Sequence, residues 1–318
     1  MTLSLVIPVW NDPAGLRRLL VQALALGVFS QIIVSDDNSV PEVSAAALGV
    51  SDPAILWLRS PVQRGAGHAR NIALERVTGA HVIFFDSDDV FLDEFPVLVG
   101  ELAGMTYDFC LFRHADSRMR LHGGLGPLDA DDAAWQAAGA MADRPTPLSA
   151  EGAARLCQIS AYPWNKIYRT GFLRAHGIRC TEIVVHNDLE LHWMGFLKAE
   201  RILTSGRVCC QHFVQDDGGR LTNRSGRERL EVFRALEAVG AALVASPRMR
   251  DYLEPFAAFY MRLFDWIGQA VEPELRASLD AMVRRFLLVQ LSEPVFTLIV
   301  LRNPWVGVRI NRALGGGG

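Results

Sequence analysis

Residues 79–90 read GAHVIFFDSDDV, and this stretch decides the fold class that the sequence predicts. The apolar run at 82–85 has the length and the β-branched and aromatic residues of a buried strand. Three aspartates and one serine follow it directly, at 86–89. In open α/β sheets, ligands bind beyond the carboxyl ends of the strands. The stretch therefore predicts an α/β sheet with an acidic ligand-binding group at one strand end.

The residues before this stretch alternate between predicted strands and helices. Leu3–Val9, Ile32–Val34 and Ile55–Leu58 are short apolar runs, whereas Pro13 and Gly67 open segments with helical spacing. Such alternation favours a largely parallel sheet. Periodicity weakens between Asp116 and Pro147, which predicts loops or an insertion there. Helical periodicity returns from Arg227 to about Val300. We therefore expect three regions: a nucleotide-binding core at 1–115, an acceptor-side part at 116–215 and a mostly helical region at 216–318.

Composition limits the classes of function. The chain has 318 residues, half of them hydrophobic, and a net charge of −3. That near-neutral balance gives no reason to expect nucleic acid as a partner. The five cysteines show no metal-ligand spacing, which favours reduced thiols and a cytoplasmic location. We find no signal peptide and no uninterrupted apolar run of about 18 residues, as a spanning helix would need.

Acidic residues follow two of the predicted strands. Asp36 and Asp37 come after the second strand, and Asp86, Asp88 and Asp89 come after the fourth. Carboxylates this close repel one another unless a cation, N–H donors or water compensate. Oxygen ligands of this kind suit Mg²⁺ or Mn²⁺ placed between carboxylates and substrate phosphates. A simpler alternative is that the last two aspartates cap the following helix.

A glycine-containing segment, RGAGHARN at 64–71, spans the start of the second predicted helix. Glycines at a helix start let backbone N–H groups approach an anion, and Arg70 adds a cation. The segment is a degenerate version of a dinucleotide-binding motif. However, it lacks the third glycine and follows the third strand rather than the first, so the order expected of a dehydrogenase is wrong.

Taken together, these segments resemble the family 2 glycosyltransferases. Four motifs carry the resemblance, in the order and at the spacing of that family: SLVIPVWN at 4–11, IIVSDDNS at 32–39, GAGHARN at 65–71 and GAHVIFFDSDDV at 79–90. A looser similarity continues through Trp164–Tyr168 and His186–Asp188 to about His212. The resemblance implies the GT-A fold, an α/β nucleotide-binding mixed sheet flanked by helices. It also implies an inverting transfer from a nucleotide-diphosphate sugar, most commonly a UDP-sugar.

The resemblance also implies roles in donor binding. Asp37, with Asp36 beside it, matches the acid that hydrogen-bonds the nucleotide base. Arg70 matches a basic residue near the base and the phosphates, and Lys166 is a second candidate cation for the diphosphate. The remaining residues that we expect to line the donor site are Pro8, Val9, Trp10, Gly65, Asp86 and Ser87.

The resemblance assigns the metal and the base as well. Asp86 and Asp88 match the DXD pair that holds Mn²⁺ or Mg²⁺, and His212 is a further candidate ligand. Asp188 matches the catalytic base, although Asn187 stands where the family often has Glu. Trp164 either stacks on the acceptor sugar or anchors the fold. The other histidines of this region, His186 and His192, are expected to be structural.

The expected acceptor is a glycan or lipid-linked glycan in cell-surface polysaccharide assembly. The apolar stretch Val295–Ile310, with Arg302 and Arg309, could lie on a membrane surface, whereas packing against the domain or a second subunit is the plainer alternative. The oligomeric state stays open. Two rival functions are a sugar-phosphate nucleotidyltransferase and a non-catalytic nucleotide-sugar or glycan-binding module. The first would show a Gly-rich, Arg-Lys segment after the first strand, where this chain has Trp10–Pro13.

Overall fold

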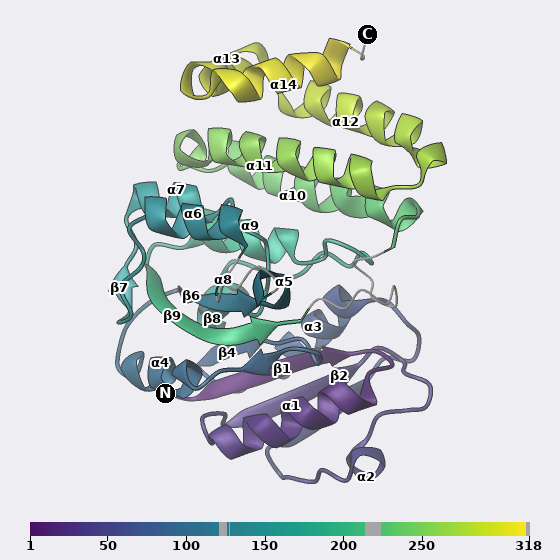
Figure 1. Ribbon diagram of the computed structural model, residues 1–318, viewed down its shortest axis with the longest axis vertical. Coiled ribbons are helices and arrows are strands. Elements are labelled where there is room, and N and C mark those ends of the chain that lie inside the picture. Colours follow the sequence, from purple (N-terminus) through teal and green to yellow (C-terminus); the bar gives the residue numbers. More distant parts are fainter. Residues whose placement is uncertain (121–125, 127, 214–223, 316–318) are drawn as a thin grey trace.

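The computed structural model describes residues 1–120, 126, 128–213 and 224–315. Within these ranges a mixed nine-stranded sheet has the order β3-β2-β1-β4-β8-β6-β9-β5, and β7 pairs with β9. Figure 1 shows the sheet at the N-terminal end of an elongated molecule, with helices stacked above it toward the C-terminus. The predicted α/β class is therefore confirmed.

The parallel half of the sheet is formed by the predicted strands. They are β1 (Leu3–Val9), β2 (Gln31–Asp36), β3 (Ile55–Arg59) and β4 (His81–Phe84), and β1 lies between β2 and β4. Along β1, alternate side chains point to opposite faces: Leu5 and Ile7 belong to one apolar core, and Val6 belongs to the other. Both faces of this half are thus buried, as expected for parallel strands.

Helices cover both faces of the sheet. One core lies between the strands and two helices, α1 (Pro13–Leu26) and α4 (Glu94–Glu101). Asp12 begins α1 by accepting a hydrogen bond from the Gly15 N–H at 2.9 Å. The opposite face carries α3 (Ala66–Leu74), which begins one residue before the Gly67 that the sequence indicated. A short helix, α2 (Ala45–Leu48), lies in the β2–β3 connection.

The other half of the sheet is formed by residues of the middle region. Its strands are β5 (Val90–Phe91), β6 (Phe109–Asp116), β7 (Thr146–Pro147), β8 (Lys166–Arg169) and β9 (Ile202–His212). β8 is antiparallel to both β4 and β6, whereas β6 and β9 are parallel. The accompanying helices are α5 (Ser117–Arg120), α6 (Asp129–Ala137), α7 (Ala150–Leu156), α8 (Thr170–Ala175) and α9 (Leu189–Lys198).

The sequence did not indicate one helix of this middle region. The segment between Asp116 and Pro147 was expected to consist of loops or an insertion, and it contains α6. This helix buries only Asp131 and Trp135. Two buried positions do not make an apolar stripe, so helical periodicity gave no signal there.

The C-terminal region is helical, as predicted. It contains η2 (Arg227–Glu231), α10 (Val232–Val244), α11 (Met249–Ala270), η3 (Pro273–Leu275), α12 (Arg276–Gln290), α13 (Glu293–Arg302) and α14 (Pro304–Gly315). Figure 1 shows α10 and α11 directly above the sheet domain, with α12–α14 at the far end. Aromatic contacts among Phe233, Tyr260, Phe264 and Phe286 join three of these helices. No helix in the described ranges is long and apolar enough to cross a bilayer.

Candidate functional site

The ends of β1 and β2 meet at one edge of the sheet. Val9 lies opposite Asp36 in the parallel register, and the Asp37 N–H donates to the Val9 carbonyl at 2.9 Å. Pro8 is buried at the same edge, and Trp10 is partly exposed beyond it. The structure thus assembles the residues that were expected to surround the nucleotide base.

The two aspartates at this edge are buried and hold protein groups. Asp36 accepts a hydrogen bond from the Ser39 N–H at 2.8 Å and pairs with Arg59. Asp37 accepts from the N–H groups of Arg64 at 2.8 Å and Gly65 at 2.6 Å. These bonds fix the glycine-containing loop against the end of β2. The contact between Asp37 and a nucleotide base stays a prediction.

Gly65 is placed where glycine is needed. It precedes the first residue of α3, and its φ of 90° is in the region that residues with a Cβ rarely adopt. This conformation lets its N–H donate to Asp37 while the chain turns into the helix. Arg70 follows from the first turns of α3.

The buried guanidinium of Arg70 joins the segment after β4 to the segment before α9, about a hundred residues later in the sequence. Nη2 donates to Asp86, directly after β4, at 2.5 Å, and Nη1 donates to the side-chain oxygen of Asn187 at 2.6 Å. Asn187 immediately precedes Asp188. Arg70 therefore connects the predicted donor site with the predicted base. Sequence reasoning missed the role of Asn187, and no local signal indicated it.

The segment that carries Asp188 is packed closely against α3. Asn71 exchanges two hydrogen bonds with the Cys180 backbone, at 2.9 and 3.0 Å. Gly67 approaches the same segment so closely that a Cβ there would lie 2.4 Å from the Thr181 carbonyl oxygen. Glu182 accepts hydrogen bonds from Arg64 and Asn71. These contacts hold Asp188 in one position relative to Arg70.

Asp188 lies at the start of α9 and is partly exposed. Burial removes water from around the Asp188 carboxyl and raises its pKa to about 6, although the positive charge of Arg70 opposes this rise. Asp86 adds to the rise because its charge disfavours a second nearby carboxylate. A carboxylate with this pKa is deprotonated at neutral pH and still basic enough to accept a proton.

Lys166 is buried at the start of β8. Its ammonium donates to the Tyr162 carbonyl at 2.6 Å and to the Asn165 side chain at 2.7 Å. Burial lowers the pKa of Lys166 to about 7, whereas the charges of Asp188 and Asp131 oppose the fall. Lys166 is therefore close enough to Asp188 to influence its charge. Its contact with a diphosphate stays a prediction.

Trp164 is a structural residue in this arrangement. It is buried, and its ring stacks on Tyr162 with centroids 4.4 Å apart. A buried ring offers no face to an acceptor sugar, so the anchoring alternative holds. His192 is also structural, because it is buried and contacts the Cys157 carbonyl at 2.9 Å.

The four residues after β4 have different surroundings. Asp86 is partly exposed beside Arg70, and Ser87 donates to Asp12 at 2.7 Å. Asp88 is partly exposed, and its backbone carbonyl accepts from Arg18 at 2.6 Å. The proposed helix-capping role of Asp88 and Asp89 was wrong, since α4 starts at Glu94 with Asp93 before it.

Asp89 instead orients His212, at the end of β9. Its buried carboxylate contacts Nδ1 of His212 at 2.9 Å and accepts from the Phe213 N–H at 3.0 Å. Burial would lower the pKa of His212, but the bond to Asp89 outweighs it and raises the pKa. The His212 ring also stacks on Trp164, with centroids 5.1 Å apart. A histidine held through Nδ1 by a carboxylate keeps Nε2 for another partner.

Among the described residues, no three or more His, Cys, Asp or Glu side chains form a group that could hold a metal ion. The protein therefore builds no closed metal cage there. Asp86 and Asp88 follow β4, whereas His212 ends β9, and β8 and β6 separate these two strands in the sheet. The structure therefore does not bring the three predicted ligands into one such group. Carboxylate oxygens suit Mg²⁺ and Mn²⁺, and Mg²⁺ commonly takes only one or two carboxylates plus substrate phosphates. The two carboxylates after β4 could hold such an ion only together with oxygen ligands from a bound diphosphate, and the metal stays a prediction.

Comparisons with known proteins cover the N-terminal part most clearly. Residues 4–132 match the model of the family described as glycosyl transferase family 2. A stretch of 93 residues is 31% identical to the Escherichia coli protein named UDP-Glc:alpha-D-GlcNAc-diphosphoundecaprenol beta-1,3-glucosyltransferase WfgD. That alignment covers 28% of this chain and 36% of WfgD, so the chain spans about a third of the length of this curated relative.

Solved structures match over nearly the whole chain. S. aureus TarS 1–349 aligns with a TM-score of 0.72 at 18% identity, covering 99% of this chain and 89% of TarS 1–349. The same protein in complex with UDP-GlcNAc aligns with a TM-score of 0.75 at 17% identity, with the same coverage. At these identities the similarity shows the fold, and it includes the C-terminal helices.

Proposed function

Because residues 4–132 match the model of glycosyl transferase family 2, we propose that this protein transfers a sugar from a nucleotide-diphosphate sugar to an acceptor hydroxyl. The transfer inverts the anomeric carbon. The observation that carries the proposal is the position of Arg70 between Asp86 and Asn187. It brings the donor-side carboxylate and the segment of the base to one site, where a donor and an acceptor have to meet.

In this mechanism Asp188 is the general base. It takes the proton from the acceptor hydroxyl as the oxygen attacks the anomeric carbon. A single carboxylate is enough, because the diphosphate leaves without needing a proton from the protein, in contrast to the paired carboxylates of glycosidases. Arg70 keeps a buried positive charge beside the site and orients Asp86, and Lys166 is a second candidate cation.

We propose Mn²⁺ or Mg²⁺ as the cofactor, held by Asp86 and Asp88 with His212 as a further ligand. When bound, such an ion neutralises charge that develops on the departing diphosphate. Support comes from the oxygen donors after β4 and from the Asp89–His212 bond, which fixes the imidazole. The protein residues contribute by positioning: Ser87 ties this turn to Asp12, and Arg70 ties it to the segment of the base.

We propose a UDP-sugar as the donor and a glycan or lipid-linked glycan as the acceptor, in cell-surface polysaccharide assembly. WfgD is named for a UDP-Glc donor and a diphosphoundecaprenol-linked acceptor, and TarS binds UDP-GlcNAc. All five cysteines are buried free thiols, which fits a reducing, cytoplasmic location.

A donor panel tests this proposal. Melting temperature is measured with UDP, GDP, CDP and TDP and with their common sugars, each with and without Mn²⁺. We expect a shift for UDP and one or more UDP-sugars that depends on metal, because selective binding stabilises the folded state. Incubation of the stabilising donor with lipid-linked glycan acceptors should then release UDP. Donor binding without transfer to any acceptor would favour the non-catalytic alternative, and no shift from any nucleotide would contradict the proposal.

A further inference from the structure

The last forty described residues differ in charge from the rest of the chain. Residues 276–315 contain six arginines and two acidic residues, whereas the whole chain has a net charge of −3. These residues form α12, α13 and α14, at the end of the molecule farthest from α1 and α2 (Figure 1). One end of the protein is therefore basic although the protein as a whole is slightly acidic, and this end is suited to an anionic partner.

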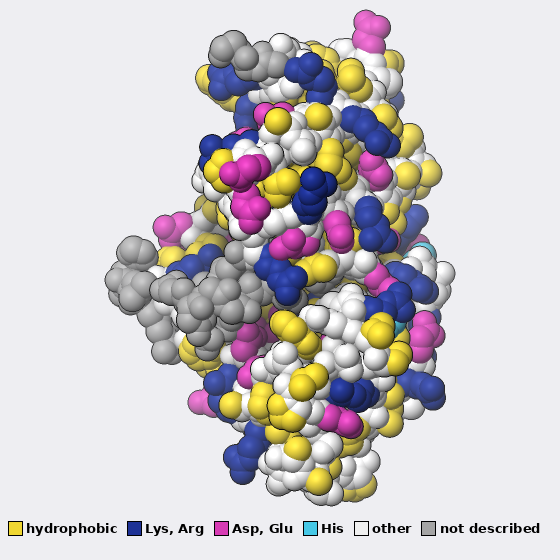
Figure 2. Space-filling model, turned by 90° about the vertical axis from the view of Figure 1, so that its right-hand side faces the viewer, with side chains coloured by type: hydrophobic (Ala, Val, Ile, Leu, Met, Phe, Trp, Pro, Cys, Tyr) yellow, Lys and Arg dark blue, Asp and Glu magenta, His cyan; other side chains and the backbone are white. Residues whose placement is uncertain are grey.

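The same helices expose large apolar side chains. Trp305 is 78% exposed, Leu301 75%, Val289 71%, Leu288 66% and Val308 50%. Among the other exposed large hydrophobic residues of the described ranges, only Val40 exceeds 60%. Figure 2 shows hydrophobic side chains interspersed with Lys and Arg over this end of the molecule. Basic and apolar side chains together are typical of proteins that lie on a membrane surface.

The helix α14 separates its two faces clearly. Val306, Gly307 and Ile310 are buried against the neighbouring helices. Trp305 is followed by Val308, Arg309 and Arg312 at spacings of three, four and seven residues. Side chains at these spacings share one face of a helix. The outward face of α14 thus combines an aromatic residue and an aliphatic residue with two arginines.

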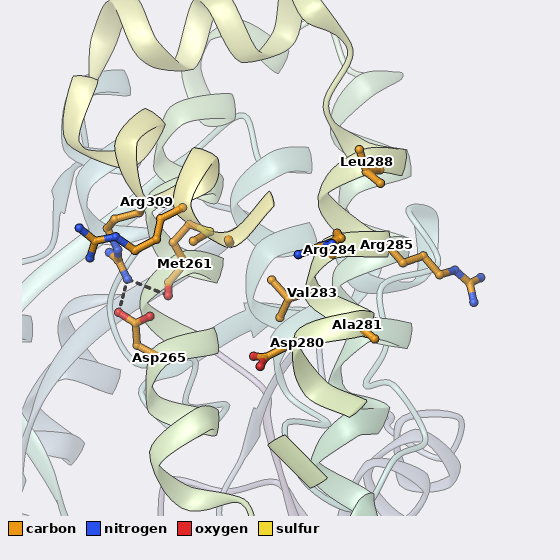
Figure 3. Close-up of a pocket in the computed structure, with 11 residues that line it drawn as sticks. Met261, Asp265, Asp280, Ala281, Val283, Arg284, Arg285, Leu288 and Arg309 are labelled. Atoms are coloured by element: carbon orange, nitrogen blue, oxygen red, sulfur yellow. Dashed lines mark hydrogen bonds and ion pairs between the residues drawn. The ribbon is translucent and has the colours of Figure 1, made fainter. Parts of the chain in front are cut away.

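A pocket of about 820 Å³ lies between α14 and α12 and is lined in part by Arg309 and Arg312 of this face. It lies between α11, α12 and α14, away from the strand ends of the donor site, and Arg284, Arg285, Leu288, Arg309 and Arg312 help to line it. Figure 3 shows Arg309 on one side, bonded to Asp265 and to the Met261 carbonyl, with Arg285 directed away from it on the other side. Arg284, Arg285 and Arg312 make no ion pair within the described residues, and Asp280 is the remaining acid of the pocket.

We propose that this surface, consisting of Arg284, Arg285, Leu288, Trp305, Val308 and Arg312, docks on a bilayer that contains anionic phospholipid. The arginines bind lipid phosphates, and the apolar side chains enter the boundary between headgroups and acyl chains. A second copy of the chain fits less well, because a two-fold contact through this surface would bring the same arginines together. The inference goes beyond sugar transfer and does not depend on it.

Cosedimentation of the full chain with vesicles tests the proposal. We expect binding to phosphatidylcholine vesicles that contain phosphatidylglycerol, loss of binding at high salt, and little binding to pure phosphatidylcholine. The triple variant Arg284→Glu, Arg285→Glu, Arg312→Glu should bind at least about tenfold more weakly. The matched control, Arg76→Glu, Arg144→Glu, Arg179→Glu, makes the same charge change at exposed positions outside α12–α14 and should bind like the wild type.

Two further measurements separate the outcomes. Trp305→Ala should weaken vesicle binding while circular dichroism and the melting temperature stay near those of the wild type, since the side chain is exposed. The elution volume of this variant in size-exclusion chromatography should also equal that of the wild type. The proposal is overturned if the wild type fails to bind anionic vesicles at low salt, or if the control triple variant loses binding equally. A dimer that Trp305→Ala converts to a monomer would overturn it too, because the surface would then be a subunit interface.

Discussion

Arg70 donates a hydrogen bond to the side-chain oxygen of Asn187 at 2.6 Å, and this buried contact holds the positive guanidinium beside the residue that precedes the candidate base. Asn187 is neutral, so Arg70 is balanced by Asp86 and by the more distant charge of Asp188. A carboxylate at position 187 would change that balance.

Asn187→Asp should move the pH dependence of transfer. The base works in its ionised form, so wild-type kcat/KM should rise as pH increases through about 6, the pKa of Asp188. A new carboxylate beside Asp188 disfavours its ionisation and raises that pKa further. The acid limb of the pH profile should therefore shift to higher pH. Asn311→Asp, on an exposed position of α14, is the control and should leave the profile unchanged. An unshifted limb in Asn187→Asp would mean that another group controls it.

Asp188→Asn should separate catalysis from stability. We expect kcat to fall by about 10²–10⁴ because the base is lost, while donor affinity is kept. The folded pKa of about 6 lies above the ordinary value of 3.8, so ionised Asp188 costs the folded state free energy as pH rises through that range. The free energy of unfolding of the variant should thus exceed that of the wild type by up to about 3 kcal/mol at pH 8, with no gain below pH 4.

Chemical denaturation at both pH values measures that difference. Glu200→Gln, at an exposed position, removes one carboxylate without these effects and serves as the control. Normal turnover in Asp188→Asn would remove this residue as the base, whatever the stability result.

Gly67→Ala should damage the site through packing alone. The added Cβ would lie 2.4 Å from the Thr181 carbonyl oxygen and 2.9 Å from Cβ of Asn187, so α3 and the segment of Asp188 would have to move apart. We expect a loss of about 1–3 kcal/mol in the free energy of unfolding, with reduced kcat. Gly100→Ala in α4 meets no atom within 4 Å and should be neutral or slightly stabilising. Equal stability and activity of the two variants would contradict the close packing.

Removal of the metal should stop transfer reversibly. EDTA is expected to abolish activity, and excess Mn²⁺ or Mg²⁺ to restore it, because few protein ligands hold the ion. Asp88→Asn should raise the metal concentration needed for half-maximal rate. Full activity in EDTA would show that the diphosphate leaves without a metal. Because Asp88 is only partly exposed, the melting temperature of the variant is measured as well, and a normal value confirms that its fold is intact.

The sequence by itself determined the parallel half of the sheet and the list of candidate residues. Strands such as β1 and β4 are largely apolar, and a strand buried on both faces needs this pattern wherever it lies. The aspartates after β2 and β4 could be located for the same reason, since a residue that follows a strand must lie at its end. Local patterns also indicated the helical C-terminal region.

Only the tertiary structure decided what those residues contact. Asp37 holds the loop at Gly65, Asp89 orients His212, and Trp164 is buried against Tyr162. The Arg70 contacts with Asp86 and Asn187 join α3, β4 and the start of α9. Such bonds depend on which elements are neighbours in space, and hydrophobic periodicity carries no information about pairs a hundred residues apart. The helix α6 escaped prediction for a related reason, since it packs through one tryptophan and not through a stripe.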